Sequence, residues 1–129
     1  GMVFAVNDYA RLVGIRLGEN PEIAWEYLDD LSEVASPVAT PDFVILAASF
    51  GTVTCLDSKT GERYWYEDFD EGFYSSPIIV GENIYLMDVD GGTPRCVRVM
   101  MHLNSQHSRS EMRHVYLEGA RGLRDDLPE

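Results

Sequence analysis

Short runs of apolar or alternating residues, each closed by glycine, aspartate or proline, fill most of the chain. Such runs, rich in β-branched and aromatic side chains, are typical of strands, and the polar breaks between them are typical of tight turns. Residues 43–48 are apolar at every position, which predicts a strand covered on both faces. The pattern therefore predicts an all-β fold of short antiparallel strands.

The runs fall into three sets. The expected strands are 2–6, 12–17 and 23–28 in a first set without an innermost strand, 34–39, 43–50, 52–56 and 62–67 in a complete second set, and 74–80, 83–89 and 94–99 in a third. Between the last two strands of the second set lies a polar turn in which Asp57 can accept hydrogen bonds from nearby amides and Gly61 suits a positive φ.

A period of forty residues relates the sets. Trp25 recurs as Trp65, Ser36-Pro37 recurs as Ser76-Pro77, and residues 43–46 recur as 83–86. Residues 3–6 are expected to align with 43–46 in the same way. Four short strands in a repeat of roughly 40 to 50 residues are the size of one β-propeller blade.

The pattern Ser-Pro, apolar strand, Gly51, Leu56-Asp57, Thr60-Gly61 and Trp65 resembles the PQQ-like β-propeller repeat, whose family includes quinoprotein alcohol dehydrogenases and an outer-membrane assembly lipoprotein. In that family Thr-Gly-x-x-x-Trp is the tryptophan-docking motif, in which the indole packs on the glycine peptide of the adjacent blade. The resemblance implies structural docking roles for Gly61, Trp65 and Trp25, although Gly18-Glu19 replaces Thr-Gly in the first copy.

The expected architecture is a partial β-propeller of four-stranded antiparallel blades over residues 1–99, followed by an irregular tail over 100–129. The length of 129 residues gives room for about three blades, whereas closed propellers use roughly 4 to 8. An unclosed array exposes strand edges. We therefore expect a fragment of a larger propeller or self-association through open blade edges.

The tail differs in charge from the rest of the chain. Residues 1–94 hold 4 basic and 17 acidic side chains, whereas residues 95–129 hold 6 and 5. Two structures compete in the tail: a strand at 114–117, which is slightly favoured, and a helix that begins at the capping box Ser108 to Glu111. A deletion, a fusion or a sequence error would each explain the loss of the repeat here.

The two cysteines, Cys55 and Cys96, are expected to be buried free thiols. The repeat aligns them as equivalent positions of neighbouring blades, and such positions point alike and lie beyond the Cα distance of roughly 7 Å that a disulfide allows.

Two acidic loops are expected at one end of the blades, one repeat apart. Their members are candidates for a partner-binding rim that docks a basic partner or a cation, although a solvated loop is the commoner role of such charge runs. The rim residues are Asp29, Asp30, Glu67, Asp68, Asp70 and Glu71, with Glu33 alongside. Phe69, Phe73 and Tyr74 follow in the second loop, and aromatic side chains exposed there would form an interface hot spot.

The sequence favours a non-catalytic protein-interaction scaffold. It contains no motif for a catalytic, cofactor-binding or metal site, so no cofactor is expected. The acidic balance argues against nucleic acid, and no apolar run is long enough to span a membrane. Alternatives are part of a quinoprotein dehydrogenase, which would use PQQ with calcium, and a sugar or small-ligand sensor. The resemblance implies an extracytoplasmic, periplasmic setting.

Overall fold

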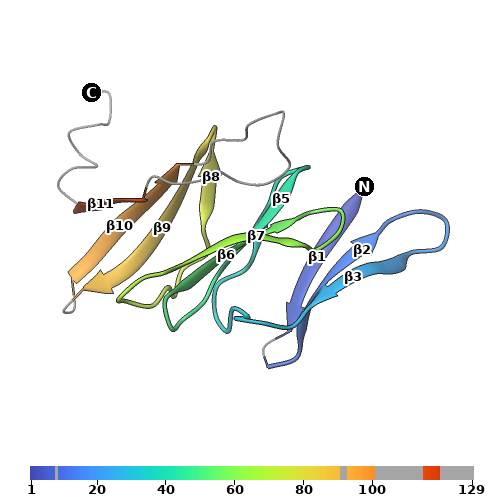
Figure 1. The fold of residues 1–129 in the computed structure, drawn as a ribbon, viewed down its shortest axis with the longest axis horizontal. Helices are drawn as coiled ribbons and strands as arrows, with labels where there is room; N and C mark the ends of the chain where they lie inside the picture. The colour runs from blue at the N-terminus through green and yellow to red at the C-terminus, as the bar shows by residue number, and fades with distance from the viewer. Residues whose placement is uncertain (8, 91–92, 101–114, 120–129) are drawn as a thin grey trace.

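Three antiparallel sheets follow one another in chain order across the molecule (Figure 1). The computed structural model describes residues 1–7, 9–90, 93–100 and 115–119. We call the sheets blade 1, with strand order β1-β2-β3, blade 2, with order β4-β5-β6-β7, and blade 3, with order β8-β9-β10-β11. The described part contains strands and no helix, so the predicted all-β fold of propeller blades is confirmed.

The strand bounds agree closely with the predicted runs. The strands are β1 (Met2–Asn7), β2 (Arg11–Arg16), β3 (Glu22–Tyr27), β4 (Val38–Ala39), β5 (Phe43–Ala47), β6 (Thr52–Asp57), β7 (Arg63–Asp68), β8 (Ile78–Val80), β9 (Asn83–Asp90), β10 (Thr93–Met100) and β11 (Val115–Gly119). The innermost strands β4 and β8 are shorter than predicted. Pro37 and Pro77 directly precede them, and proline has no amide hydrogen to donate to a ladder.

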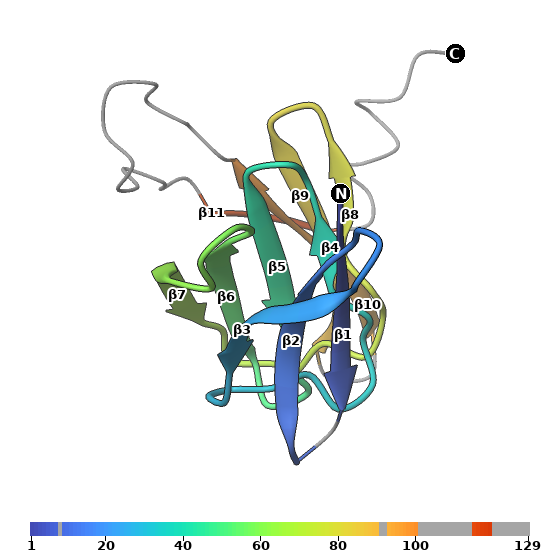
Figure 2. The same cartoon turned by 90° about the vertical axis from the view of Figure 1, so that its right-hand side faces the viewer.

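The β1 edge of blade 1 carries no further strand among the described residues. Within the described part, β1 pairs with β2 and with no other strand, as expected for a blade without its innermost strand. In blades 2 and 3 the equivalent edges are covered by β4 and β8 (Figure 2).

Two apolar clusters hold the blades together. Between blades 1 and 2, Leu12, Trp25 and Tyr27 pack with residues of β5 and β6. Between blades 2 and 3, the other faces of β5 and β6 pack with Ile84, Leu86, Val97 and Val99 of blade 3 and with Phe73. All five residues of β5 are buried, which confirms the prediction of a strand covered on both faces.

The tail contributes the fourth strand of blade 3. β11 pairs antiparallel with β10, and Val97 lies opposite Leu117. The strand interpretation is therefore confirmed for residues 115–119, and the competing helix is wrong for them. The proposed capping box at Ser108 and Glu111 lies outside the described residues.

Two alignments based on the forty-residue period are wrong. Counted back from the tryptophan of each blade, Gly14 and Phe4 take the positions of Cys55 and Ile45. The offset is thus 41 there, because the hairpin that leads to Trp25 is one residue longer, and residues 3–6 do not align with 43–46.

Cys96 is likewise not the equivalent of Cys55. Tyr85 takes the place of Ile45 in blade 3, and Arg98 lies opposite Tyr85 as Cys55 lies opposite Ile45. The β9–β10 hairpin is longer than the β5–β6 hairpin, which shifts β10 along the blade. The prediction of two buried free thiols is nevertheless confirmed.

Candidate functional site

The indole of Trp25 lies between a glycine of its own blade and a glycine of the next. A Cβ placed on Gly14 would lie 2.3 Å from ring atom Cε2, and one on Gly61 would lie 2.6 Å from Cε3. The ring Nε1 donates a hydrogen bond of 2.9 Å to the carbonyl oxygen of Ser58. Because ordinary Cβ contacts are not that short, both neighbours of the ring must be glycine.

The turn that receives Trp25 is held by the Asp57 carboxylate. Its Oδ1 accepts hydrogen bonds from the backbone amides of Lys59, at 2.7 Å, and Thr60, at 2.9 Å, and its Oδ2 accepts one from the Tyr64 hydroxyl. Burial raises the pKa of Asp57, but the bonds from Tyr64, Lys59 and Thr60 outweigh burial, so the pKa lies below its ordinary value. Gly61 completes the turn with a φ of 72°.

Trp65 sits in different surroundings. Its cross-strand partner is Cys55, where Trp25 has Gly14. The ring is half-buried against the cluster between blades 2 and 3. Its Nε1 is buried and has no hydrogen-bond partner among the described residues. Trp25, Gly61 and Trp65 therefore contribute to packing between strands and blades.

The six predicted rim residues lie at one end of the blades: Asp29 and Asp30 in the β3–β4 loop, Glu67 and Asp68 at the end of β7, and Asp70 and Glu71 in the β7–β8 loop. In Figure 1 the β3–β4 and β7–β8 loops both run along the lower end of the sheets. We call this end the acidic end. Asp29, Asp68 and Asp70 are exposed there, and Asp30, Glu67 and Glu71 are half-buried.

The two loops differ in their charge balance. Arg63 lies within electrostatic reach of Asp29, which contributes to its raised pKa after the larger contribution of Tyr27. The same guanidinium lies 4.7 Å from the centre of the Tyr66 ring. In the described part of the chain, no salt bridge joins the acidic residues of the β7–β8 loop to a cation.

Short backbone contacts fix the acidic end. The backbone amide of Phe69 donates a hydrogen bond of 2.9 Å to the carbonyl oxygen of Gly51. A Cβ on Gly72 would lie 1.7 Å from the backbone carbonyl oxygen of Ser49. The Ser49 hydroxyl in turn donates to Glu33 at 2.8 Å, so the β3–β4 loop is linked to the β5–β6 turn. The Thr52 hydroxyl donates a hydrogen bond of 2.7 Å to Oδ1 of Asp68.

A hollow of about 230 Å³ opens at the same end. We call it the loop hollow; its lining residues are Tyr9, Leu28, Asp30, Leu31, Glu33 and Phe50. Tyr9 is 86%, Leu28 65% and Phe50 55% exposed, which is a large exposure for apolar side chains gathered in one place. Sequence reasoning missed this hollow because its members come from three separate turns.

The predicted aromatic residues of the second loop divide into two kinds. Phe73 is fully buried, and Phe69 packs against it edge to face with ring centres 5.3 Å apart. Tyr74 remains exposed and is the member of this group available to a partner.

Within the described residues no group of three or more histidine, cysteine, aspartate or glutamate side chains is arranged to hold a metal ion. All three histidines lie outside the described residues. Among the described residues there is also no helix long and apolar enough to cross a membrane.

Two family models match overlapping parts of the chain. The model described as outer membrane protein assembly factor BamB matches residues 1–67 and, in an overlapping second match, 22–100. The model of chorismate mutase type I matches residues 75–127. Chorismate mutase AroH of Bacillus subtilis (strain 168) is 49% identical over 41 residues, which are 32% of this chain and 32% of that protein. The chain thus matches about a third of this curated relative.

Solved structures with propeller blades superpose on most of the chain. A europium-containing methanol dehydrogenase matches 90% of it with a TM-score of 0.65 and 12% identity. BamB from Moraxella catarrhalis matches 78% with 0.61 and 17%, and quinohemoprotein alcohol dehydrogenase ADHIIG from Pseudomonas putida HK5 matches 77% with 0.59 and 15%. At sequence identities this low, the structural likeness shows a shared fold and nothing about a shared function. The chain covers 22%, 30% and 17% of the three proteins.

Proposed function

Because the chain belongs to the family of outer membrane protein assembly factor BamB, we propose that it is a non-catalytic protein-interaction module whose acidic end binds a basic partner. The chain covers less than a third of its BamB-like neighbour, so the partner is inferred from this chain's own surface. We further propose an extracytoplasmic, periplasmic location, in keeping with the family.

The observation that carries the proposal is the overlap of charge and apolar surface at one end. Asp30 and Glu33 line the loop hollow together with the exposed side chains of Tyr9, Leu28 and Phe50. Exposed apolar residues surrounded by polar ones are the usual composition of a protein-binding hot spot. The carboxylates would select a basic partner and increase its rate of association.

The test compares three forms of the full chain as bait for periplasmic proteins. The double variant Leu28→Ser with Phe50→Ser removes the apolar contacts of the loop hollow. The matched control, Leu17→Ser with Val80→Ser, changes two exposed apolar residues that do not line this hollow. We expect a basic protein that binds wild type and control, is lost from the loop-hollow variant, and dissociates as salt rises. Equal capture by all three forms would contradict the proposal.

Two other activities are tested in parallel. Saturable binding of pyrroloquinoline quinone with calcium would favour the dehydrogenase alternative, and saturable binding of a sugar would favour the sensor. The local match to AroH favours a second candidate, chorismate mutase activity, for the C-terminal part. If the purified chain consumes chorismate at a rate proportional to protein concentration, chorismate mutase activity becomes the favoured function in place of the binding module.

A further inference from the structure

The loop hollow brings aromatic rings, aliphatic side chains and carboxylates together in a small space. The rings are those of Tyr9 and Phe50, and the carboxylates are those of Asp30 and Glu33. Leu31 also packs against the apolar cluster between blades 1 and 2. The volume of about 230 Å³ is below the roughly 300 to 1,000 Å³ of pockets that hold small-molecule ligands. The hollow is therefore of a size to take one side chain of a partner.

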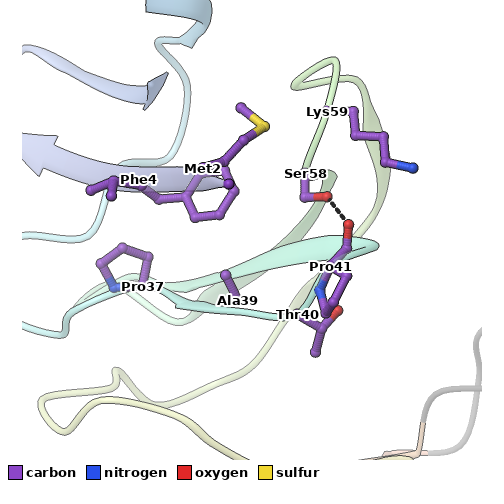
Figure 3. A pocket seen from close by; sticks show the side chains of 10 residues that line it. Met2, Phe4, Pro37, Ala39, Thr40, Pro41, Ser58 and Lys59 are labelled. Atoms are coloured by element: carbon purple, nitrogen blue, oxygen red, sulfur yellow. Dashed lines mark hydrogen bonds between the residues drawn. The ribbon is translucent and has the colours of Figure 1, made fainter. Parts of the chain in front are cut away.

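A second hollow, of about 520 Å³, has a different chemistry (Figure 3). Met2 and Phe4 of β1 lie across it from Pro37 and Ala39 in Figure 3. The described residues that line it include the cationic side chain of Lys59 and no carboxylate side chain. Negative charge therefore distinguishes the loop hollow from the second hollow.

The carboxylates of the loop hollow are available to a cation. Neither of the two salt bridges in the described part of the chain involves Asp30 or Glu33. Glu33 is exposed, and its Oε2 accepts a hydrogen bond of 2.8 Å from the Ser49 hydroxyl, which orients the carboxylate. Asp30 is half-buried. Among the described residues that line the hollow there is no cationic side chain, so its field attracts one from outside.

Two residues of the loop hollow have an unfavourable backbone conformation. Tyr9 has a φ of 57° and Asp30 a φ of 44°, and in the described part of the chain they are the non-glycine residues with positive φ. Glycine would adopt these angles without strain, and strained residues cluster at sites where their side chains are needed. Both residues line the loop hollow. The backbone thus singles out the Tyr9 ring and the Asp30 carboxylate as groups with a role in binding.

An arginine side chain has the groups that match this lining. Its planar guanidinium stacks on aromatic rings, donates several hydrogen bonds to carboxylates and is more weakly hydrated than the ammonium of lysine. Its aliphatic stem packs on apolar side chains such as Leu28 and Leu31. The chain itself contains a similar arrangement, in which the Arg63 guanidinium lies 4.7 Å from the centre of the Tyr66 ring and within electrostatic reach of Asp29.

We propose that the loop hollow binds the side chain of one arginine of the basic partner, on its aromatic rings and against the carboxylates of Asp30 and Glu33. The inference rests on the proposed function and adds the residue that is recognised. Tyr9 and Asp30 then determine specificity, because they line the site in a conformation that folding alone would give to glycine.

The probe is Nα-acetyl-arginine amide, titrated into the full chain and followed by the chemical shifts of backbone amides. We expect saturable shifts at residues 28–33 and at Phe50. Nα-acetyl-citrulline amide has nearly the same shape without the charge and should bind at least about ten-fold more weakly. Nα-acetyl-lysine amide should also bind more weakly, because its ammonium is a strongly hydrated point charge.

Variants of the chain locate the site. Asp30→Asn removes the charge and keeps a residue that tolerates a positive φ, and Asp42→Asn removes the same charge from the exposed β4–β5 turn. We expect Asp30→Asn to weaken binding of the arginine compound at least about ten-fold and Asp42→Asn to leave it unchanged.

Glycine variants separate a binding role from a structural one. Tyr9→Gly and Asp30→Gly relieve the backbone strain, so each should weaken arginine binding while the thermal midpoint of unfolding, measured by circular dichroism, is unchanged or rises. A fall in the midpoint of both variants would contradict the inference, because the two side chains would then serve folding.

Three further results would overturn the inference. They are no saturable shift of the hollow amides with the arginine compound, equal affinity for the lysine compound, and equal weakening by Asp30→Asn and Asp42→Asn. If a basic protein is captured through the loop hollow but the arginine compound does not bind, the inference alone fails. If the arginine compound binds the hollow but no basic protein is captured, the proposed function fails.

Discussion

The junction between blades 1 and 2 and the junction between blades 2 and 3 each contain a tryptophan from the same position of the repeat, yet they are built differently. Trp25 lies on Gly61 and donates a hydrogen bond to Ser58 of the next blade. Trp65 lies opposite Cys55, and its ring nitrogen has no partner among the described residues.

The difference lies in the blade that should receive each ring. Blade 2 offers a tight turn with glycine at its end, as the repeat prescribes. The described strands of blade 3 lie within residues 75–127, a segment that also matches the chorismate mutase model. An indole fastens two blades where the neighbouring blade supplies a compatible turn, and among the described residues a turn glycine lies against Trp25 and not against Trp65.

The largest expected effect is on stability when Trp25 is truncated. Trp25→Ala removes a buried ring and its hydrogen bond and should lower the free energy of unfolding by about 3 to 5 kcal/mol. Trp65→Ala removes a half-buried ring and should cost about 1 to 2 kcal/mol. Urea denaturation followed by circular dichroism measures both. Equal losses would remove the distinction between the two junctions.

The second prediction concerns the glycine beneath Trp25. Gly61→Ala combines a positive φ with a Cβ that would touch the indole, and it should cost about 2 to 4 kcal/mol. Gly81→Ala is the control, because its φ is 61° and no atom lies within 4 Å of the added carbon. Strain alone should cost about 1 to 2 kcal/mol there. If Gly61→Ala cost no more than the control, the contact with Trp25 would not contribute.

A third pair of variants separates the ring from its nitrogen. Trp25→Phe leaves the Ser58 carbonyl without its donor and should cost about 1 to 2 kcal/mol. Trp65→Phe removes a buried N–H that has no partner among the described residues, and its effect should lie within about 0.5 kcal/mol of zero. A large loss from Trp65→Phe would reveal a bond made by residues outside the described part.

The smallest effect is a change in pH dependence. The folded-state pKa of Asp57 lies below the ordinary 3.8, so its carboxylate stabilises the fold above that value and this contribution is lost as pH falls through the folded-state pKa. Asp57→Asn should therefore be less stable than wild type at neutral pH, and the gap should narrow under acid conditions. Urea denaturation at about pH 7 and about pH 3 measures the gap. Asp42→Asn, in the exposed β4–β5 turn, is the control; a gap that is constant with pH would contradict the role of Asp57.

The strands were predictable because glycine, aspartate and proline mark their ends, and because β5 is apolar at every position. Register was less predictable. One extra residue before Trp25 changes which residue of blade 2 is equivalent to each position upstream of it. A longer β9–β10 hairpin likewise makes Arg98, and not Cys96, the equivalent of Cys55. A repeat period predicts the spacing of motifs, but it does not predict which turn or strand contains an inserted residue.

The acidic loops were also visible in the sequence, because charge runs lie one repeat apart. The loop hollow was not, since Tyr9, Leu28 and Phe50 are single apolar residues in separate turns. Isolated residues of this kind become a surface only when the fold brings their turns to one end. The repeat indicated that Gly61, Trp65 and Trp25 take part in docking, whereas the contact of Trp25 with Gly61 and the lack of a partner for the Trp65 nitrogen among the described residues required the structure.

The reactivity of the Cys55 thiol can report how often the junction between blades 2 and 3 opens. Its side chain is completely buried in the cluster that joins these blades, and burial, the largest cause, raises the pKa of its thiol. Alkylating reagents react with the thiolate, so the closed junction protects this sulfur twice, by exclusion and by keeping it protonated. The rate at which Cys55 is alkylated under native conditions therefore reports how often blade 3 separates from blade 2.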